Sequence, residues 1–502
     1  MNRVRRAFVM ASVEQYLSLI VNFVLVATLS RLLTPAEIGI AVVGLGVCVI
    51  TFSLREFFTA EFLVQRPAVI AAEVQSSGTI LICACLVSGA VLMLAAPLLS
   101  RFYGEEGLQL FLAVMVLATV IDTISYPAIA LLHRELDFGN TARIRVASIV
   151  AMAVTTISFA AMGFGFMSYA WGNLVAACAT TLMTSFIHPD ALPTKPTVSS
   201  WKVVLDFGRF RGAAGIVDKI YEAIPQLVLG RFMPMSDVGL YSRMNAISGI
   251  PDKMLLSSVF SIAFPALADG VRNGRDVKSA YLHALRLICV IYWPALLLMA
   301  LLARPVVNLI LGPAWMEVVP LVRIVAVAGL FFFPVILTHP LLMATGKNKT
   351  AFVSNFVAKV AAAAILCSAS MFGLKAMAWS QFLALPLQMI IALHYARKAV
   401  WFSWRDLAGA IGSSAVVTVA AMAGPLSLAW WLEPDLDFSI VEFVIILALA
   451  FCGWFAAVIL TRHPVLGEML NLLRLQQWIG QRRSEAADGA GEHGALQGTG
   501  QA

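Results

Sequence analysis

The chain of 502 residues is 60% hydrophobic and 13% charged, whereas soluble domains average roughly 45–50% apolar and 25% charged residues. This composition excludes an ordinary soluble protein and predicts a protein embedded in a lipid bilayer. The formal net charge of +7 comes from basic residues that are spread over many short loops, so we expect no nucleic-acid partner.

Apolar stretches long enough to cross a hydrocarbon core of about 30 Å recur along the whole chain. The first span is too long for a cleaved signal peptide and contains Glu14, so we expect it to stay in the protein. After Arg462 the chain turns polar, which predicts an amphipathic segment on the membrane surface and then a disordered tail. The fourteen transmembrane helices that we expect lie at 9–30, 38–59, 76–100, 108–132, 143–163, 168–188, 203–230, 238–266, 282–303, 318–343, 351–372, 376–395, 406–432 and 439–461.

Lysine and arginine residues indicate the orientation of these spans. If both termini and the even-numbered loops are cytoplasmic, twenty-one basic residues lie inside and six lie outside. The outer residues are Arg31, Arg101, Arg231, Arg304, Arg323 and Lys375. This excess on one side predicts a multi-pass protein with both termini in the cytoplasm.

Two loop segments 200 positions apart repeat one pattern. Residues 29–40 (LSRLLTPAEIGI) align with residues 229–240 (LGRFMPMSDVGL). The arginine, acid and glycine of this repeat-loop motif are Arg31, Glu37 and Gly39 in the first copy and Arg231, Asp237 and Gly239 in the second. An even number of spans separates the copies, which predicts two parallel six-helix repeats around a central cavity. We interpret each motif as a capping or ion-pair turn that fixes its hairpin.

The repeat divides this all-α polytopic chain into five parts. The Pro-rich segment with Pro193 and Pro196 marks the boundary between the halves. The parts are an N-terminal six-helix half (1–190), a cytoplasmic linker (191–202), a C-terminal six-helix half (203–400), two additional transmembrane helices (401–461) and a cytoplasmic amphipathic segment with a disordered tail (462–502).

The seventh predicted span carries the most ionisable residues, and at about 100° per residue they gather into one polar stripe. The stripe contains Arg211, Asp218, Lys219, Glu222 and Gln226. Charges inside a membrane are costly and usually face a cavity or a partner. The stripe therefore either lines a water-filled, substrate-facing path or consists of acids and bases that neutralise one another and only orient the helix.

Two smaller polar groups lie in the first two spans. Glu14, Ser18 and Asn22 follow one another at intervals of four residues and share one face of the first span. Arg55 and Glu56 lie near the inner end of the second span, and we expect them to pair with each other.

These patterns give two sets of candidate site residues. The substrate and cavity candidates are Arg211, Lys219, Gln226, Arg243, Lys253 and Asn22. The acids that could bind a proton or sodium ion for coupling are Glu14, Asp122, Asp218, Glu222 and Asp252. The seven cysteines lie in apolar spans, the histidines are scattered, and no G-x-x-x-x-G-K-[ST] motif occurs. We therefore expect no metal site, no disulfide framework and no cofactor.

Five short stretches carry a family resemblance through their order and spacing. They are residues 30–39 (SRLLTPAEIG), 62–66 (FLVQR), 131–138 (LLHRELDF), 230–243 (GRFMPMSDVGLYSR) and 311–315 (LGPAW). Together they resemble the polysaccharide transporter family, the flippases for lipid-linked oligosaccharides. This family belongs to the superfamily that also holds the multidrug-and-toxin exporters.

The resemblance implies a transporter rather than an enzyme. Such a protein would move undecaprenyl-pyrophosphate-linked oligosaccharide across the bacterial inner membrane by alternating access, for exopolysaccharide, capsule or O-antigen (lipopolysaccharide) synthesis. Its partners would be the lipid-linked oligosaccharide, membrane lipid, a polysaccharide polymerase and a chain-length regulator. One alternative is an ion-coupled multidrug exporter of the same superfamily. Another is a membrane glycosyltransferase or polysaccharide ligase, which the D-x-D triplet at 435–437 would suit but the short outer loops would not.

Overall fold

A computed structural model describes residues 3–58, 60, 62–65, 69–192, 196–199, 201–253, 267, 270–272, 276–432, 438–468 and 470. The fold is all-helical, with 88% helix and no strand in these described ranges. Twelve helices among the described residues are long and apolar enough to cross a membrane. The chain is therefore a multi-pass membrane protein, as the composition predicts.

Each of these twelve helices coincides with one of the fourteen predicted spans. The predicted seventh span is one continuous helix of 32 residues, Trp201–Phe232. It carries too many charged residues to count among the twelve apolar helices. The predicted eighth span begins with the helix Met235–Ser248, and its residues 254–266 lie outside the described part of the chain.

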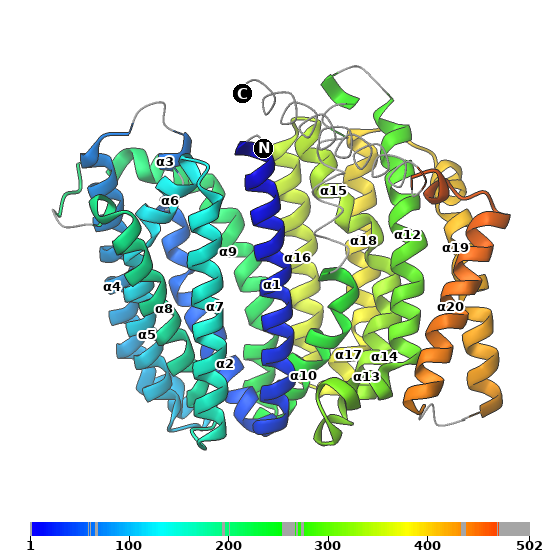
Figure 1. Ribbon diagram of the computed structural model, residues 1–502, viewed down its shortest axis with the longest axis horizontal. Helices are drawn as coiled ribbons and strands as arrows, with labels where there is room; N and C mark the ends of the chain where they lie inside the picture. Colours follow the sequence, from blue (N-terminus) through cyan, green and yellow to red (C-terminus); the bar gives the residue numbers. More distant parts are fainter. Residues whose placement is uncertain are drawn as a thin grey trace, which may run out of the picture. The chain divides into compact units, whose positions relative to one another are not determined.

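Contacts divide the chain into two compact units, of which the first comprises residues 1–250 and 299–395. The first part of this unit holds long helices that lie side by side in Figure 1, such as α7 beside α8 and α5 beside α4. Its elements are α1 (Arg3–Leu32), α2 (Pro35–Phe52), the 3₁₀ turn η1 (Ser53–Phe58), α3 (Phe62–Gln65), α4 (Ala71–Tyr103), α5 (Leu108–Ile124), α6 (Tyr126–Arg134), α7 (Phe138–Ala161), α8 (Met167–Ile187), η2 (Pro189–Ala191), α9 (Trp201–Phe232) and α10 (Met235–Ser248).

The first unit continues after residue 299 with shorter and more broken helices. Helix α14 packs against α10, and α16 packs against α9. Helix α2 packs against the same two helices, so α9 and α10 lie between α2 and the later helices of the unit. Its elements are α13 (Ala303–Ile310), η3 (Pro313–Trp315), α14 (Val318–Ala328), η4 (Gly329–Phe332), α15 (Phe333–Ala344), α16 (Asn348–Ser370), α17 (Leu374–Trp379) and α18 (Gln381–Ala399).

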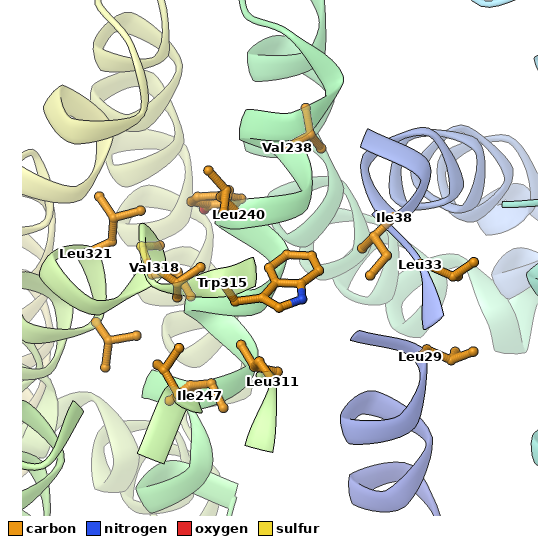
Figure 2. Packing of buried hydrophobic residues seen from close by; sticks show 14 of the residues in the cluster. Leu29, Leu33, Ile38, Val238, Leu240, Ile247, Leu311, Trp315, Val318 and Leu321 are labelled. Atoms are coloured by element: carbon orange, nitrogen blue, oxygen red, sulfur yellow. The ribbon is translucent and has the colours of Figure 1, made fainter. Parts of the chain in front are cut away.

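The core of the first unit lies where the two copies of the repeat-loop motif meet. Trp315 is fully buried there between Ile38 of α2 and Leu240 of α10, and Val318 of α14 closes the cluster (Figure 2). Burial of one large apolar side chain stabilises a fold by roughly 1.5–3 kcal/mol in water. Because the cluster draws on both copies, it joins segments that are 200 residues apart.

Helix α2 begins at a capping box that uses the acid of the motif. The Thr34 hydroxyl accepts a hydrogen bond from the Glu37 backbone N–H at 3.3 Å, and the Glu37 carboxylate accepts one from the Thr34 N–H at 2.8 Å. Pro35 stands at the first helical position, where no N–H is needed. Thr34 and Glu37 thus fix the direction in which the chain turns from α1 into α2.

The second unit comprises residues 251–298 and 396–502, and its long described helices are α12 (Val277–Leu301), α19 (Trp404–Leu432) and α20 (Ile440–Leu460). Helices α19 and α20 pack as an antiparallel pair, and Trp454 of α20 donates to the Val290 carbonyl of α12 at 2.7 Å. Exposed tryptophans lie at both ends of α19, at Trp404 and Trp430. A helix rise of 1.5 Å puts them roughly 39 Å apart, which matches two interfacial aromatic belts.

Candidate functional site

The middle of α9 carries two neighbouring charges that bind different elements. Lys219 forms an ion pair with Glu56 of η1. Asp218 accepts hydrogen bonds from Lys359 at 2.7 Å and from Asn355 at 2.9 Å, both on α16. These residues keep between a fifth and a half of their side-chain surface exposed, so water or a ligand can reach them. Helix α9 therefore connects the N-terminal part of the unit to its later part through charges near mid-span.

The contact between η1 and α9 depends on a glycine. A Cβ atom built on Gly212 would lie 2.9 Å from the Glu56 carbonyl oxygen and 2.9 Å from the Phe57 nitrogen. Such distances are too short for a real side chain, so only glycine lets the two backbones come this close. The close approach brings Glu56 within reach of Lys219.

Arg55 lies beside this pair and was missing from the candidate residues. Its guanidinium stacks 5.0 Å over the Tyr126 ring, and the Tyr126 hydroxyl donates to Asp122 at 3.0 Å. The expected pairing of Arg55 with Glu56 is wrong, because Glu56 binds Lys219 instead. Adjacent residues point in different directions from a helical turn, and this spacing alone could have excluded the pair. Nη1 of Arg55 is buried and has no hydrogen-bond partner among the residues that the structure describes.

Two cavities adjoin Arg55. The first has a volume of about 370 Å³ and lies among α2, α5, α7 and α8, with Lys219 of α9 at its wall. Its polar lining residues are Arg55, Thr119, Asp122, Ser148, Asn173 and Lys219. The second has a volume of about 230 Å³ and is lined by Arg55, Glu56, Tyr126 and His133 among others. The candidates Asp122 and Lys219 thus share one cavity.

The remaining candidates of α1 and α9 are scattered. Glu14 pairs with Arg145 of α7 at 3.0 Å, and Asn22 donates to the Ser18 carbonyl within α1. Gln226 lies against Gly46 of α2, and Glu222 is exposed. The side chain of Arg211 lies outside the described part of the chain.

Three basic or acidic candidates are not among the residues that line these cavities. Arg243 is 4% exposed and donates to the Tyr169 hydroxyl at 3.1 Å, with its guanidinium 5.7 Å from the Trp315 ring. Asp252 accepts a hydrogen bond from Tyr292 within the second unit, and Lys253 next to it is exposed. Arg243 therefore belongs to the buried core around the motif copies rather than to an open cavity.

The two copies of the repeat-loop motif contact each other reciprocally. A Cβ atom on Gly39 would overlap the carbonyl of Met235, and one on Gly239 would overlap the carbonyl of Pro35. Met235 is the residue that corresponds to Pro35, so each glycine meets the same position of the other copy. Such an exchange of partners is the mark of a two-fold relation between two segments.

Each motif arginine also contacts an element outside its own motif copy. Arg31 donates to the Leu309 carbonyl at 2.8 Å, and Arg231 stacks 4.7 Å over the Phe102 ring. Trp315 donates from its indole nitrogen to the Ser30 carbonyl at 2.6 Å. We call these contacts, together with the reciprocal glycines, the repeat clasp.

The acids of the two motif copies differ in environment. Glu37 caps α2, as described above, whereas Asp237 lies near Glu317. Burial and, to a lesser extent, the Glu317 carboxylate raise the pKa of Asp237 above its usual value.

Comparison with known proteins gives consistent matches over most of the chain. The family described as "Polysaccharide biosynthesis protein" matches residues 28–320. The succinoglycan biosynthesis transport protein ExoT of Rhizobium meliloti (strain 1021) is 24% identical over 365 residues, which are 71% of this chain and 73% of that protein. The lipopolysaccharide biosynthesis protein WzxC of Escherichia coli (strain K12) is 22% identical over 313 residues, which are 62% of this chain and 63% of WzxC.

Solved structures extend the likeness to the fold. The lipid II flippase MurJ in an inward closed conformation has a TM-score of 0.67 and 13% identity, and the match covers 91% of this chain and 99% of MurJ. An inward-facing multidrug resistance transporter of the MATE family in the MOP superfamily has a TM-score of 0.60 and 15% identity, covering 78% of this chain and 98% of the transporter. At these identities the likeness concerns the fold alone.

Proposed function

This chain belongs to the family of polysaccharide biosynthesis proteins, and from that premise we propose that it is a flippase for lipid-linked oligosaccharide. It carries undecaprenyl-pyrophosphate-linked repeat units across the bacterial inner membrane for exopolysaccharide, capsule or O-antigen synthesis. The observation that carries this proposal is the group of partly exposed charges at mid-span of α9, with Lys219 and Asp218 at its centre. Charges at that depth are retained mainly where they face water, a ligand or a partner.

The charge pairs of α9 suit an anionic head group that exchanges partners with them. Lys219 and Lys359 each neutralise one carboxylate, so neither is an uncompensated charge in the empty protein. A diphosphate that enters the seam between the halves competes with Glu56 and Asp218 for these ammonium groups. Binding therefore loosens the ties of α9 to η1 and to α16, and it favours a different arrangement of the two parts.

Fourteen transmembrane helices in two parallel repeats are the layout that best accommodates these features. Helices α9 and α10 add the seventh and eighth spans to the twelve apolar ones. The reciprocal contact of Gly39 and Gly239 supports a two-fold axis along the membrane normal, between α2 and α10. In this layout both termini are cytoplasmic and the repeat clasp lies on the outer side.

The position of the repeat clasp supports alternating access as the mode of transport. While Arg31, Trp315 and the two motif glycines hold their partners, the seam is closed at the end of α1, α2, α9 and α10. Release of substrate to the outside requires these contacts to separate. Asp218 and Glu222 on α9 are the acids that we assign to ion coupling, because the first is tied to Lys359 and the second is exposed.

The test is export in a bacterial strain that lacks its own copy of this gene. Wild-type protein restores surface polysaccharide, and the double variant Lys219→Gln/Glu56→Gln inserts normally but restores little. Both charges are removed together, so no unpaired charge remains in the membrane. Lys278→Gln/Asp406→Asn is the matched control, since it likewise removes both members of an ion pair, at 2.7 Å, in the second unit. Full export by the double variant, or a change in drug susceptibility without a change in polysaccharide, refutes the proposal.

A further inference from the structure

We propose that the 370 Å³ cavity in the first unit binds one neutral sugar ring of the carried glycan, through Arg55, Asp122 and Asn173. This inference rests on the proposed function in one respect: it assumes that the sugar ring belongs to the transported oligosaccharide. The binding itself needs no transport and can be measured on its own.

The size and lining of the cavity suit a single sugar unit. Its volume falls at the lower end of the roughly 300–1,000 Å³ found for small-molecule sites. The apolar lining residues include Phe52, Met115 and Met152, which offer contact to the C–H face of a ring. The polar lining residues come from η1, α5, α7, α8 and α9, and a few polar groups in a mostly apolar lining are the pattern of a site with a defined ligand orientation.

The hydrogen-bond groups of this cavity include both unused donors and unused acceptors. Among the described residues, Nη1 of Arg55 is buried and has no hydrogen-bond partner. The contact of Asp122 with the Tyr126 hydroxyl engages Oδ2, so within the same residues its Oδ1 remains available. Asn173 lines the cavity and donates from Nδ2 to the Tyr169 carbonyl, which leaves its Oδ1 as an acceptor. A ligand that satisfies all three must both donate and accept.

Hydroxyl groups meet this requirement and anions do not. Each hydroxyl donates one hydrogen bond and accepts others, whereas an ionised carboxylate or the fully ionised diphosphate of a lipid carrier only accepts. An anion that reached Arg55 would face the Asp122 carboxylate across the same cavity. Lys219 at the cavity lining is paired with Glu56, so an anion binds it only by displacing that carboxylate. The lining is thus balanced in charge, and it selects hydroxyls over the phosphates of the lipid carrier.

The experiment measures sugar binding to the purified full-length protein in lipid nanodiscs, by ligand-detected saturation-transfer NMR. The probes are methyl β-glucoside, methyl β-glucuronoside and inorganic phosphate. We expect the glucoside to bind, and Arg55→Gln and Asp122→Asn each to weaken it about tenfold, as the loss of a hydrogen bond to a charged group does. Arg397→Gln, the stacked arginine of the second unit, should bind as the wild type does. Thermal unfolding of each variant shows that the protein is folded.

Competition between the probes separates a sugar site from a general anion site. Phosphate should fail to displace the glucoside, and the glucuronoside should bind more weakly because its carboxylate meets Asp122. Displacement by phosphate would overturn the inference in favour of a phosphate site. Equal binding of glucoside by wild type, Arg55→Gln and Asp122→Asn would also overturn it. Either result leaves the export assay, and with it the proposed function, unaffected.

Discussion

The repeat clasp offers the sharpest test of how this protein moves, through the substitution Gly39→Ala. The added methyl group overlaps the Met235 carbonyl and lies 3.2 Å from the Gly239 nitrogen, so α2 and α10 must move apart. Insertion of an extra methyl group into a packed contact typically costs roughly 1–3 kcal/mol. This cost falls only on the state in which the clasp is closed. It therefore shifts the population towards the open state by about 5- to 140-fold.

Chemical labelling of Ser30→Cys reports on this shift. Ser30 is 3% exposed because Trp315 covers it, so a membrane-impermeant maleimide applied outside should react with Ser30→Cys slowly. In a background that lacks the native cysteines, Gly39→Ala should raise the labelling rate. Gly409→Ala is the matched control, since a Cβ at that position of α19 meets no described atom within 4 Å beyond its chain neighbours and the backbone of its own helix.

Two results would refute this reasoning. If Gly39→Ala inserts and folds but leaves the labelling of Ser30→Cys unchanged, the glycine contact does not hold the clasp closed. If Gly409→Ala raises labelling as much, the effect reports on general loosening of the protein and not on the clasp.

Three further substitutions test other contacts. Lys219→Gln alone should impair insertion or stability more than the double variant with Glu56→Gln, because it leaves an unpaired carboxylate; equal yields of the two proteins in membranes would contradict this. Trp315→Phe removes the hydrogen bond to the Ser30 carbonyl and should lower the thermal unfolding midpoint by a few degrees, as expected from a loss of about 1 kcal/mol; an unchanged midpoint would contradict it. Burial, with smaller effects from neighbouring positive groups, lowers the pKa of His463 to about 4, so the unfolded chain binds more protons and stability should fall as the pH drops from about 6.5 to 4. His463→Gln should lessen that pH dependence in thermal unfolding.

The sequence predicts the twelve apolar spans well because length and apolarity alone decide whether a helix can cross a bilayer. It also predicts α9 as a span, because residues 203–230 form an apolar stretch of sufficient length despite their charges. The reciprocal glycine contact adds what the alignment lacks. The aligned sequences indicate that Gly39 and Gly239 have equivalent positions in their motif copies. They do not indicate that each glycine packs against the other copy.

The partners of the charged residues could not be predicted in this way. Glu56 and Lys219 are 163 positions apart, and nothing local to either residue encodes the other. Arg243 is a second residue whose surroundings could not be predicted from the sequence. Its position in an apolar span suggested a cavity, but the packing of Tyr169 and Trp315 around it is set by helices that are distant in the sequence. A charge in a span indicates that some partner exists, while the tertiary fold determines which one.

Helix α9 links the candidate site to the repeat clasp through its own length. From Lys219 to Arg231 the helix rises roughly 18 Å, and the first residue binds η1 while the second stacks on Phe102 of α4. Pro225 lies between them within the continuous helix, and its missing N–H removes one backbone hydrogen bond there. A helix is stiff along its axis but bends where a hydrogen bond is absent, so Pro225 divides α9 into a site-facing and a clasp-facing segment. A change of partner at Lys219 can then tilt one segment against the other, and the strain reaches the contact that opens in the proposed alternating access.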